Sequence, residues 1–153
     1  MAINAAASMP TKEALAILVD ASPTMAKHLP TIRQDLAHHM ADRTLHAKQD
    51  KILLFQMGTE DASSLVRSEM EQAAPDDPGY AHSARARPWD FVGKSDLLDA
   101  IAQLEPQPHQ ADVYDALLVA TEELVRSVKK LRVSRRILKL TDGAAPSDAD
   151  AAA

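Results

Sequence analysis

The stretch LAILVDASPT, residues 15–24, decides the fold of this chain. Its apolar run from Leu15 to Val19 stops at Asp20, and the turn-forming Ser22-Pro23-Thr24 follows at once. A short, continuous apolar run with a breaker behind it is typical of a strand that is buried on both faces of a parallel sheet. We therefore predict a central strand whose carboxyl end carries an acid.

Three later segments are also predicted to be strands. Residues 51–57, KILLFQM, form an apolar run that is closed by a glycine, and residues 137–140, ILKL, form a run that ends at Thr141-Asp142-Gly143. The polar segment 80–87, with Pro88 behind it, suits the edge of a sheet better than its centre.

Apolar residues at helical spacing predict three helices between these strands. One begins near Pro30, one follows a cap at Ser95 and ends before Pro106, and one runs roughly from Asp112 to Leu131. Residues 60–79 show no clear period, so no regular element is predicted there. Alternation of apolar strands with helices predicts an α/β fold with parallel crossovers.

Length and composition fit a single ordinary domain of 153 residues. With 25% charged residues and a net charge of −5, the chain is predicted to be folded, and it is not expected to coat nucleic acid by positive charge. Absence of cysteine excludes disulfides, thiolate metal sites and a cysteine nucleophile. No apolar run reaches the roughly 20 residues that span a membrane, so no membrane partner is expected. Flexible tails are predicted at 1–11 and 144–153, around a domain at 12–143.

Two of the predicted strands end in an acid, Asp20 and Asp142. In open α/β sheets the functional crevice lies outside the carboxyl ends of the strands. Together with Ser22 and Thr24, Asp20 spells D-x-S-x-T, and carboxylate and hydroxyl oxygens are suitable ligands for Mg²⁺. The alternative is a local turn, in which the Asp20 and Ser22 side chains bind nearby backbone groups.

Other candidate chemistry is weaker. The segment 126–139 carries seven basic residues and no acid; they are Arg126, Lys129, Lys130, Arg132, Arg135, Arg136 and Lys139. We favour the solvated end of a helix over phosphate binding, because no aromatic side chain is interleaved to stack on bases. The six histidines form no H-x-x-x-H pair and are expected at the surface. No Walker loop, G-x-G-x-x-G or nucleophile elbow is present, so nothing supports an enzyme.

Taken together, these motifs resemble a von Willebrand factor A-type domain, whose first strand ends in D-x-S-x-S and whose fourth ends in T-D-G. More narrowly, they resemble the N-terminal domain of the larger subunit of eukaryotic Ku. The resemblance implies a Rossmann-like, three-layer sandwich with a mostly parallel sheet. The matching stretches follow the family's order: LVD at 18–20 with Met25, ILLF at 52–55 with Gly58-Thr59, DLLDAI at 96–101, QADVYDAL at 110–117 and LTDG at 140–143.

The resemblance also bears on the metal. In A-type domains that bind a metal, a threonine near the start of a later helix completes the site. Here that position falls at Ala111 or Asp112; alanine cannot coordinate a cation, and Asp112 could do so only with an altered geometry. We therefore expect no cofactor and a degenerate, empty metal site at Asp20, Ser22, Thr24 and Asp142.

Length is a second departure from the family. A-type domains continue with further helices and strands after T-D-G, and Ku then adds a β-barrel that encircles DNA. This sequence stops shortly after Gly143. We expect a truncated domain, incomplete at its C-terminus, in which the strand at 137–140 is an exposed edge that lowers stability.

The resemblance implies a non-enzymatic scaffold that acts in the nucleus, in DNA double-strand break repair by non-homologous end joining and in telomere maintenance. Its partners would be the smaller Ku subunit, peptide motifs of repair factors and, only through the complete heterodimer, DNA ends. The family is often labelled an ATP-dependent helicase. A stand-alone A-type domain that binds a partner through Mg²⁺ is the alternative. A small enzyme using Asp20 or Asp142 as a base is a third hypothesis, which lacks a suitable partner residue.

Overall fold

A four-stranded sheet in the order β3-β2-β1-β4 crosses the molecule in a computed structural model. The structure describes residues 12–47, 49–61, 63–76, 82–92, 96–110, 112–128 and 132–144. β1 pairs in parallel with both β2 and β4, whereas β3 pairs antiparallel with β2. The predicted α/β fold with a mostly parallel sheet is therefore confirmed. The strands are β1 (Glu13–Asp20), β2 (Lys51–Met57), β3 (Ser83–Phe91) and β4 (Ser134–Leu140).

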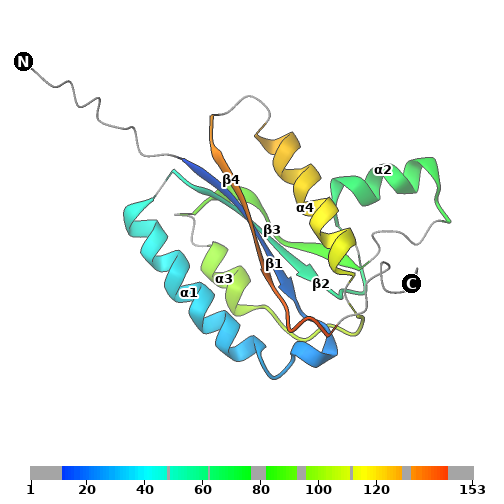
Figure 1. Cartoon of the computed structure of the whole chain (residues 1–153), viewed down its shortest axis with the longest axis horizontal. Coiled ribbons are helices and arrows are strands. Elements are labelled where there is room, and N and C mark those ends of the chain that lie inside the picture. The colour runs from blue at the N-terminus through cyan, green and yellow to red at the C-terminus, as the bar shows by residue number, and fades with distance from the viewer. Residues whose placement is uncertain are drawn as a thin grey trace, which may run out of the picture.

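Helices cover both faces of the sheet and make a three-layer sandwich (Figure 1). The longest, α1 (Leu29–His46), follows a short 3-10 turn, η1 (Pro23–Met25), and lies with α3 (Asp96–Ala102) on one face. The other face carries α4 (Val113–Ser127), with α2 (Leu65–Ala73) beside it.

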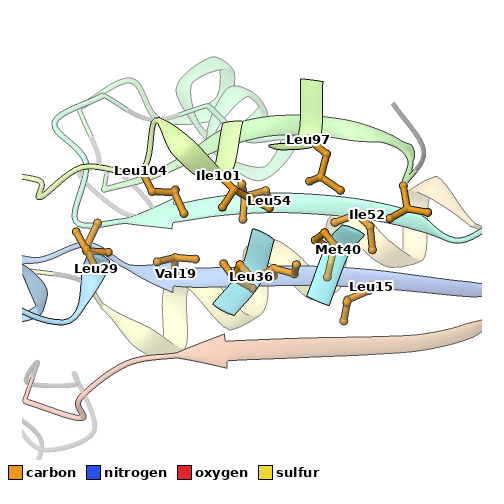
Figure 2. Packing of buried hydrophobic residues seen from close by; sticks show 13 residues of the cluster. Leu15, Val19, Leu29, Leu36, Met40, Ile52, Leu54, Leu97, Ile101 and Leu104 are labelled. Carbon is orange, nitrogen blue, oxygen red and sulfur yellow. The ribbon is translucent and has the colours of Figure 1, made fainter. Parts of the chain in front are cut away.

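The apolar run of β1 is continuous because both of its faces are buried. Leu15, Ile17 and Val19 belong to the core under α1 and α3, whereas Ala16 and Leu18 belong to the core under α4. Figure 2 shows the first of these cores, with side chains of α1 and α3 packed over β1 and β2. Parallel strands that are buried on both faces read in the sequence as unbroken apolar runs, as predicted for residues 15–19.

Several boundaries differ from the prediction, among them the start of β4, which lies at Ser134 and not at Ile137. β3 does not stop before Pro88 but continues to Phe91, and its pairing with β2 shifts register between Ile52 and Leu54. A proline lacks the backbone donor that a regular ladder needs, and an irregularity in an edge strand accommodates it. α4 ends at Ser127 rather than Leu131, which lies outside the described residues.

One element was not predicted at all. α2 occupies residues 65–73, where no regular structure was expected. Its N-cap is Ser64, whose side chain accepts a hydrogen bond of 3.0 Å from the backbone N–H of Arg67. A serine that accepts such a bond satisfies one of the free donors of the first turn.

Several predictions fall outside the described residues. They concern the cap at Ser95, residues 1–11 and all but the first residue of the tail at 144–153. Among the helices that the structure describes, none combines the length and the apolar character needed to cross a bilayer.

Candidate functional site

Asp20 is completely buried at the carboxyl end of β1, and both of its carboxylate oxygens accept hydrogen bonds. Oδ1 accepts from the backbone N–H of Ser22 at 3.0 Å and from the Ser22 hydroxyl. Oδ2 accepts from the hydroxyl of Thr141 at 2.7 Å. A buried carboxylate is costly unless such donors replace water, and here two hydroxyls and one amide do so.

Thr141 is the residue at this site that the sequence analysis did not assign. The register of β4 explains its position: Val19 lies opposite Leu140 in the parallel ladder, so the next residues along, Asp20 and Thr141, lie level with each other. The T-D-G motif could have indicated Thr141, because its threonine and its aspartate are the first two residues after the strand.

Asp142 is exposed and makes contacts different from those of Asp20. Its Oδ1 accepts a 2.9 Å hydrogen bond from the backbone N–H of Ala144. The pKa of Asp142 lies below its usual value, and that backbone bond is the largest cause. A hydrogen bond from the Thr24 side chain and then the electrostatic effect of His28 lower the pKa further. The candidate residues thus form two pairs at one end of the sheet, Asp20 with Ser22 and Asp142 with Thr24.

Gly58 closes the same end of the sheet, just after β2. Its φ of +88° lies in the left-handed region, and a Cβ at this position would meet the carbonyl oxygen of His109 at 2.5 Å. The backbone of Ser22 is the next neighbour, at 3.3 Å. Only glycine combines this backbone conformation with so close an approach.

His82 and His109 stack beside this glycine, with ring centroids 4.2 Å apart and an angle of 21° between the ring planes. Gly58 holds both backbones, because its N–H donates to the His82 carbonyl at 2.8 Å and its carbonyl accepts from the His109 N–H at 3.0 Å. Both histidines are half-buried. No sequence spacing links them, because the loop after β2 brings them together.

Asp112 caps α4 and is already engaged there. Its Oδ1 accepts from the backbone N–H groups of Tyr114 and Asp115, at 2.9 and 3.1 Å. The positive end of the helix dipole also stabilises a carboxylate at this position. The neighbouring Ala111 lies outside the described residues.

The five oxygen-bearing side chains at this end of the sheet form a hydrogen-bonded rim. We call Asp20, Ser22, Thr24, Thr141 and Asp142 the carboxyl rim. Carboxylates and hydroxyls are ligands for a hard cation, but here the buried carboxylate already uses both oxygens. Within the described ranges, no three or more His, Asp or Glu side chains gather as a metal site would require. Asp142 is exposed and accepts hydrogen bonds from Ala144 and Thr24.

The basic residues of 126–139 do not act as one group. Arg126 pairs with Glu69 of α2 and with Glu122, and hydrogen bonding to Arg126 holds the pKa of Glu69 below its usual value. Arg136 pairs with Glu13 at 3.4 Å. Arg135 and Lys139 are exposed on β4, and Lys129 and Lys130 lie outside the described residues.

Comparison with known proteins shows a likeness in sequence. No family model matches the chain. It is 24% identical over 135 residues to the ATP-dependent DNA helicase 2 subunit KU80 of Oryza sativa subsp. japonica. The match covers 88% of this chain but only 18% of the rice protein.

Among solved structures, the chain is similar to the pilus adhesin SpaC from Lactobacillus rhamnosus GG in its open conformation. The TM-score is 0.60, the sequence identity is 12%, and the match covers 88% of this chain and 15% of the adhesin. At that identity the likeness concerns the fold alone. The chain is thus similar in sequence to one part of a Ku80 subunit and carries an α/β fold that a bacterial adhesin also contains.

Proposed function

We propose that this chain is a Ku-type subunit domain that holds protein partners in DNA double-strand break repair by non-homologous end joining and in telomere maintenance. The observation that carries the proposal is its 24% identity to KU80 over 88% of its own length. A match of this length is far wider than one motif. Because the chain spans only 18% of that relative, the role is proposed for a domain within a larger assembly.

The proposed partners are the smaller Ku subunit and peptide motifs of repair factors, in the nucleus. DNA ends would be bound only through the complete heterodimer. The net charge of −5 supports a role in binding proteins and not DNA, because an acidic domain repels the phosphate backbone. The proposed role is non-enzymatic and needs no cofactor.

A second candidate function is metal-dependent binding of a partner's carboxylate by a stand-alone A-type domain. The observation in its favour is the gathering of Asp20, Ser22 and Thr141 at one point, with Thr24 and Asp142 next to them. A cation there would need Asp20 to release a hydroxyl that it now accepts. The two candidates differ in one measurable property, because only the second loses its partner when EDTA removes divalent cations.

The cellular role is tested by joining of linear plasmid DNA in cells from which this chain has been deleted. The proposal predicts that joining of blunt and cohesive ends falls several-fold and is restored by the wild-type chain. Restoration by Asp20→Asn, in which an amide oxygen can still accept hydrogen bonds, would favour the metal-free role. Unchanged end joining and unchanged telomere length after deletion would refute the Ku-type role.

A further inference from the structure

α2 is attached at the β3 side of the sheet, which is the side farthest from β4. Ser63, two residues before α2, forms a bridge with Ala84 of β3. Its backbone N–H donates to the Ser83 carbonyl at 3.2 Å, and its side chain accepts from the backbone N–H of Arg85 at 2.8 Å. The segment that leads into α2 is thus fixed to β3.

Ion pairs hold the body of α2 beside α4 (Figure 1). The Arg126 guanidinium donates two hydrogen bonds to Glu69, from Nη1 to Oε1 and from Nη2 to Oε2, the second at 3.0 Å. Its Nε donates to Glu122 of the same helix at 3.3 Å, which orients the guanidinium. Two-point contacts between guanidinium and carboxylate are among the stronger charged contacts. From residue 67 to residue 73, α2 is therefore attached by charge, with no fully buried side chain to support it.

α2 is too short to remain helical without this attachment. It has nine residues, and isolated helices shorter than about 12–15 residues are marginally stable in water. Loss of the contact with α4 would therefore both release and unfold α2, while Ser63 stays paired with β3. Local openings of this kind need less free energy than unfolding of the core.

A buried ion pair lies between α4 and β3, next to the segment that leads into α2. Glu123 of α4 is 3% exposed, and its Oε1 lies 3.9 Å from Nε of Arg85. The same Nε donates to the Ser63 carbonyl at 3.3 Å, so Arg85 contacts both α4 and this segment. Charged groups gain solvation when water reaches them, so an opening that exposes this pair costs less than one that exposes only apolar side chains.

We propose that α2 is a cover that opens as a unit, is held closed by the pair between Arg126 and Glu69, and shields the pair between Arg85 and Glu123. Competing charges, from salt or from a bound partner, would open it. This movement is independent of the role proposed above.

Hydrogen exchange of the full chain, followed by mass spectrometry, tests the movement. In the wild type, amides of residues 65–73 should exchange faster than those of β1, because α2 opens without global unfolding. Glu69→Gln keeps the shape of the side chain and removes its charge. It should speed exchange over residues 65–73 at least about threefold and leave β1 unchanged. In about 1 M salt, where the Debye length is about 3 Å, the wild type should approach the variant.

Glu71→Gln is the matched control. It makes the same change in the same helix, but Glu71 pairs with Arg67 of α2 itself, at 2.8 Å, and should therefore have a much smaller effect. The double variant Glu69→Gln with Arg126→Gln should exchange about as fast as either single variant, because both changes remove one pair. Equal effects of Glu69→Gln and Glu71→Gln, or exchange of residues 65–73 at the rate of β1, would overturn the proposal.

A single thiol tests what α2 covers. The chain has no cysteine, so Glu123→Cys introduces the only one. Labelling of this variant by a thiol reagent should be slow, and adding Glu69→Gln should speed it at least about threefold. Labelling at the same rate with and without Glu69→Gln would show that α2 does not shield this position and would overturn the proposal.

Discussion

The hydroxyl of Thr141 donates a 2.7 Å hydrogen bond to the Asp20 carboxylate across 121 positions of sequence. This bond joins the carboxyl ends of β1 and β4. Its acceptor is completely buried, so a missing donor could not be replaced by bulk water. The pair therefore both fixes the end of the edge strand and occupies one oxygen that a cation would need.

Removing the hydroxyl tests the first of these roles. Thr141→Val keeps the shape of the side chain but leaves Asp20 Oδ2 without its donor, and should lower the free energy of unfolding by about 1–3 kcal/mol. Thr141→Ser keeps the hydroxyl and should cost less than about 1 kcal/mol. Urea denaturation of the three proteins measures both, and equal losses would show that the hydrogen bond contributes nothing.

The close approach at Gly58 predicts a second difference. Gly58→Ala adds a Cβ that meets the His109 carbonyl oxygen at 2.5 Å, in a backbone conformation that alanine disfavours. The expected cost is about 2–4 kcal/mol, from strain together with displacement of the loop. Gly143→Ala is the matched control, because φ is +72° there but nothing lies within 4 Å of the added Cβ.

Strain alone sets the expected cost of Gly143→Ala at about 1 kcal/mol. Thermal unfolding of the two variants measures both losses of stability. The difference between them gives the cost of the contact at Gly58 beyond backbone strain. If both glycines tolerate alanine equally well, the contact between Gly58 and His109 is not tight in solution.

The ion pair between Arg87 and Asp96 predicts a dependence on pH. Arg87 is buried, and its Nε and Nη2 each donate to Asp96 at 3.2 Å. These bonds hold the pKa of Asp96 below the usual 3.8. A carboxyl group whose pKa is lower in the folded state than in the unfolded state stabilises the fold when the pH is above its unfolded-state pKa. That contribution is lost as the pH falls through its folded-state pKa.

Asp96→Asn should therefore lower the free energy of unfolding at pH 7 by only about 1 kcal/mol, because the Asp96 side chain is 55% exposed and solvent screens the pair. The difference from wild type should shrink as the pH falls below 3.8. Asp99→Asn on the same helix is the control, since Asp99 forms no ion pair within the described residues. A difference that stays constant from pH 7 to acid would contradict this account.

Titration with Mg²⁺ or Mn²⁺ by calorimetry tests the carboxyl rim. Both oxygens of Asp20 already accept hydrogen bonds, so we expect only the heat of dilution. Asp20→Ala is the control, because it removes the buried carboxylate. Micromolar binding that this substitution abolishes would favour the metal-dependent alternative.

The sequence predicts an element well when the residues that determine it are neighbours in the chain. β1 and β2 were predicted at nearly their observed bounds, because strands buried on both faces carry unbroken apolar runs. α2 was missed because it is only nine residues long and mixes four apolar residues with five polar ones, so its helical pattern was not recognised. Its ion pair between Glu69 and Arg126 of α4 spans 57 positions, and no local period reports such a contact.

The same distinction applies to the site. The two acids at strand ends were predicted from their place behind apolar runs. Which residue of Thr141-Asp142 meets Asp20 could not be predicted, because the answer depends on the register between β1 and β4. The stack of His82 on His109 depends likewise on a loop geometry that Gly58 sets.

The most direct measurement is binding of the purified smaller Ku subunit to the full chain, by biolayer interferometry in Mg²⁺ and again in EDTA. The account predicts saturable binding with the same Kd in both buffers, and the same Kd for Asp20→Asn. Absence of binding in either buffer, or binding that EDTA abolishes, would contradict it.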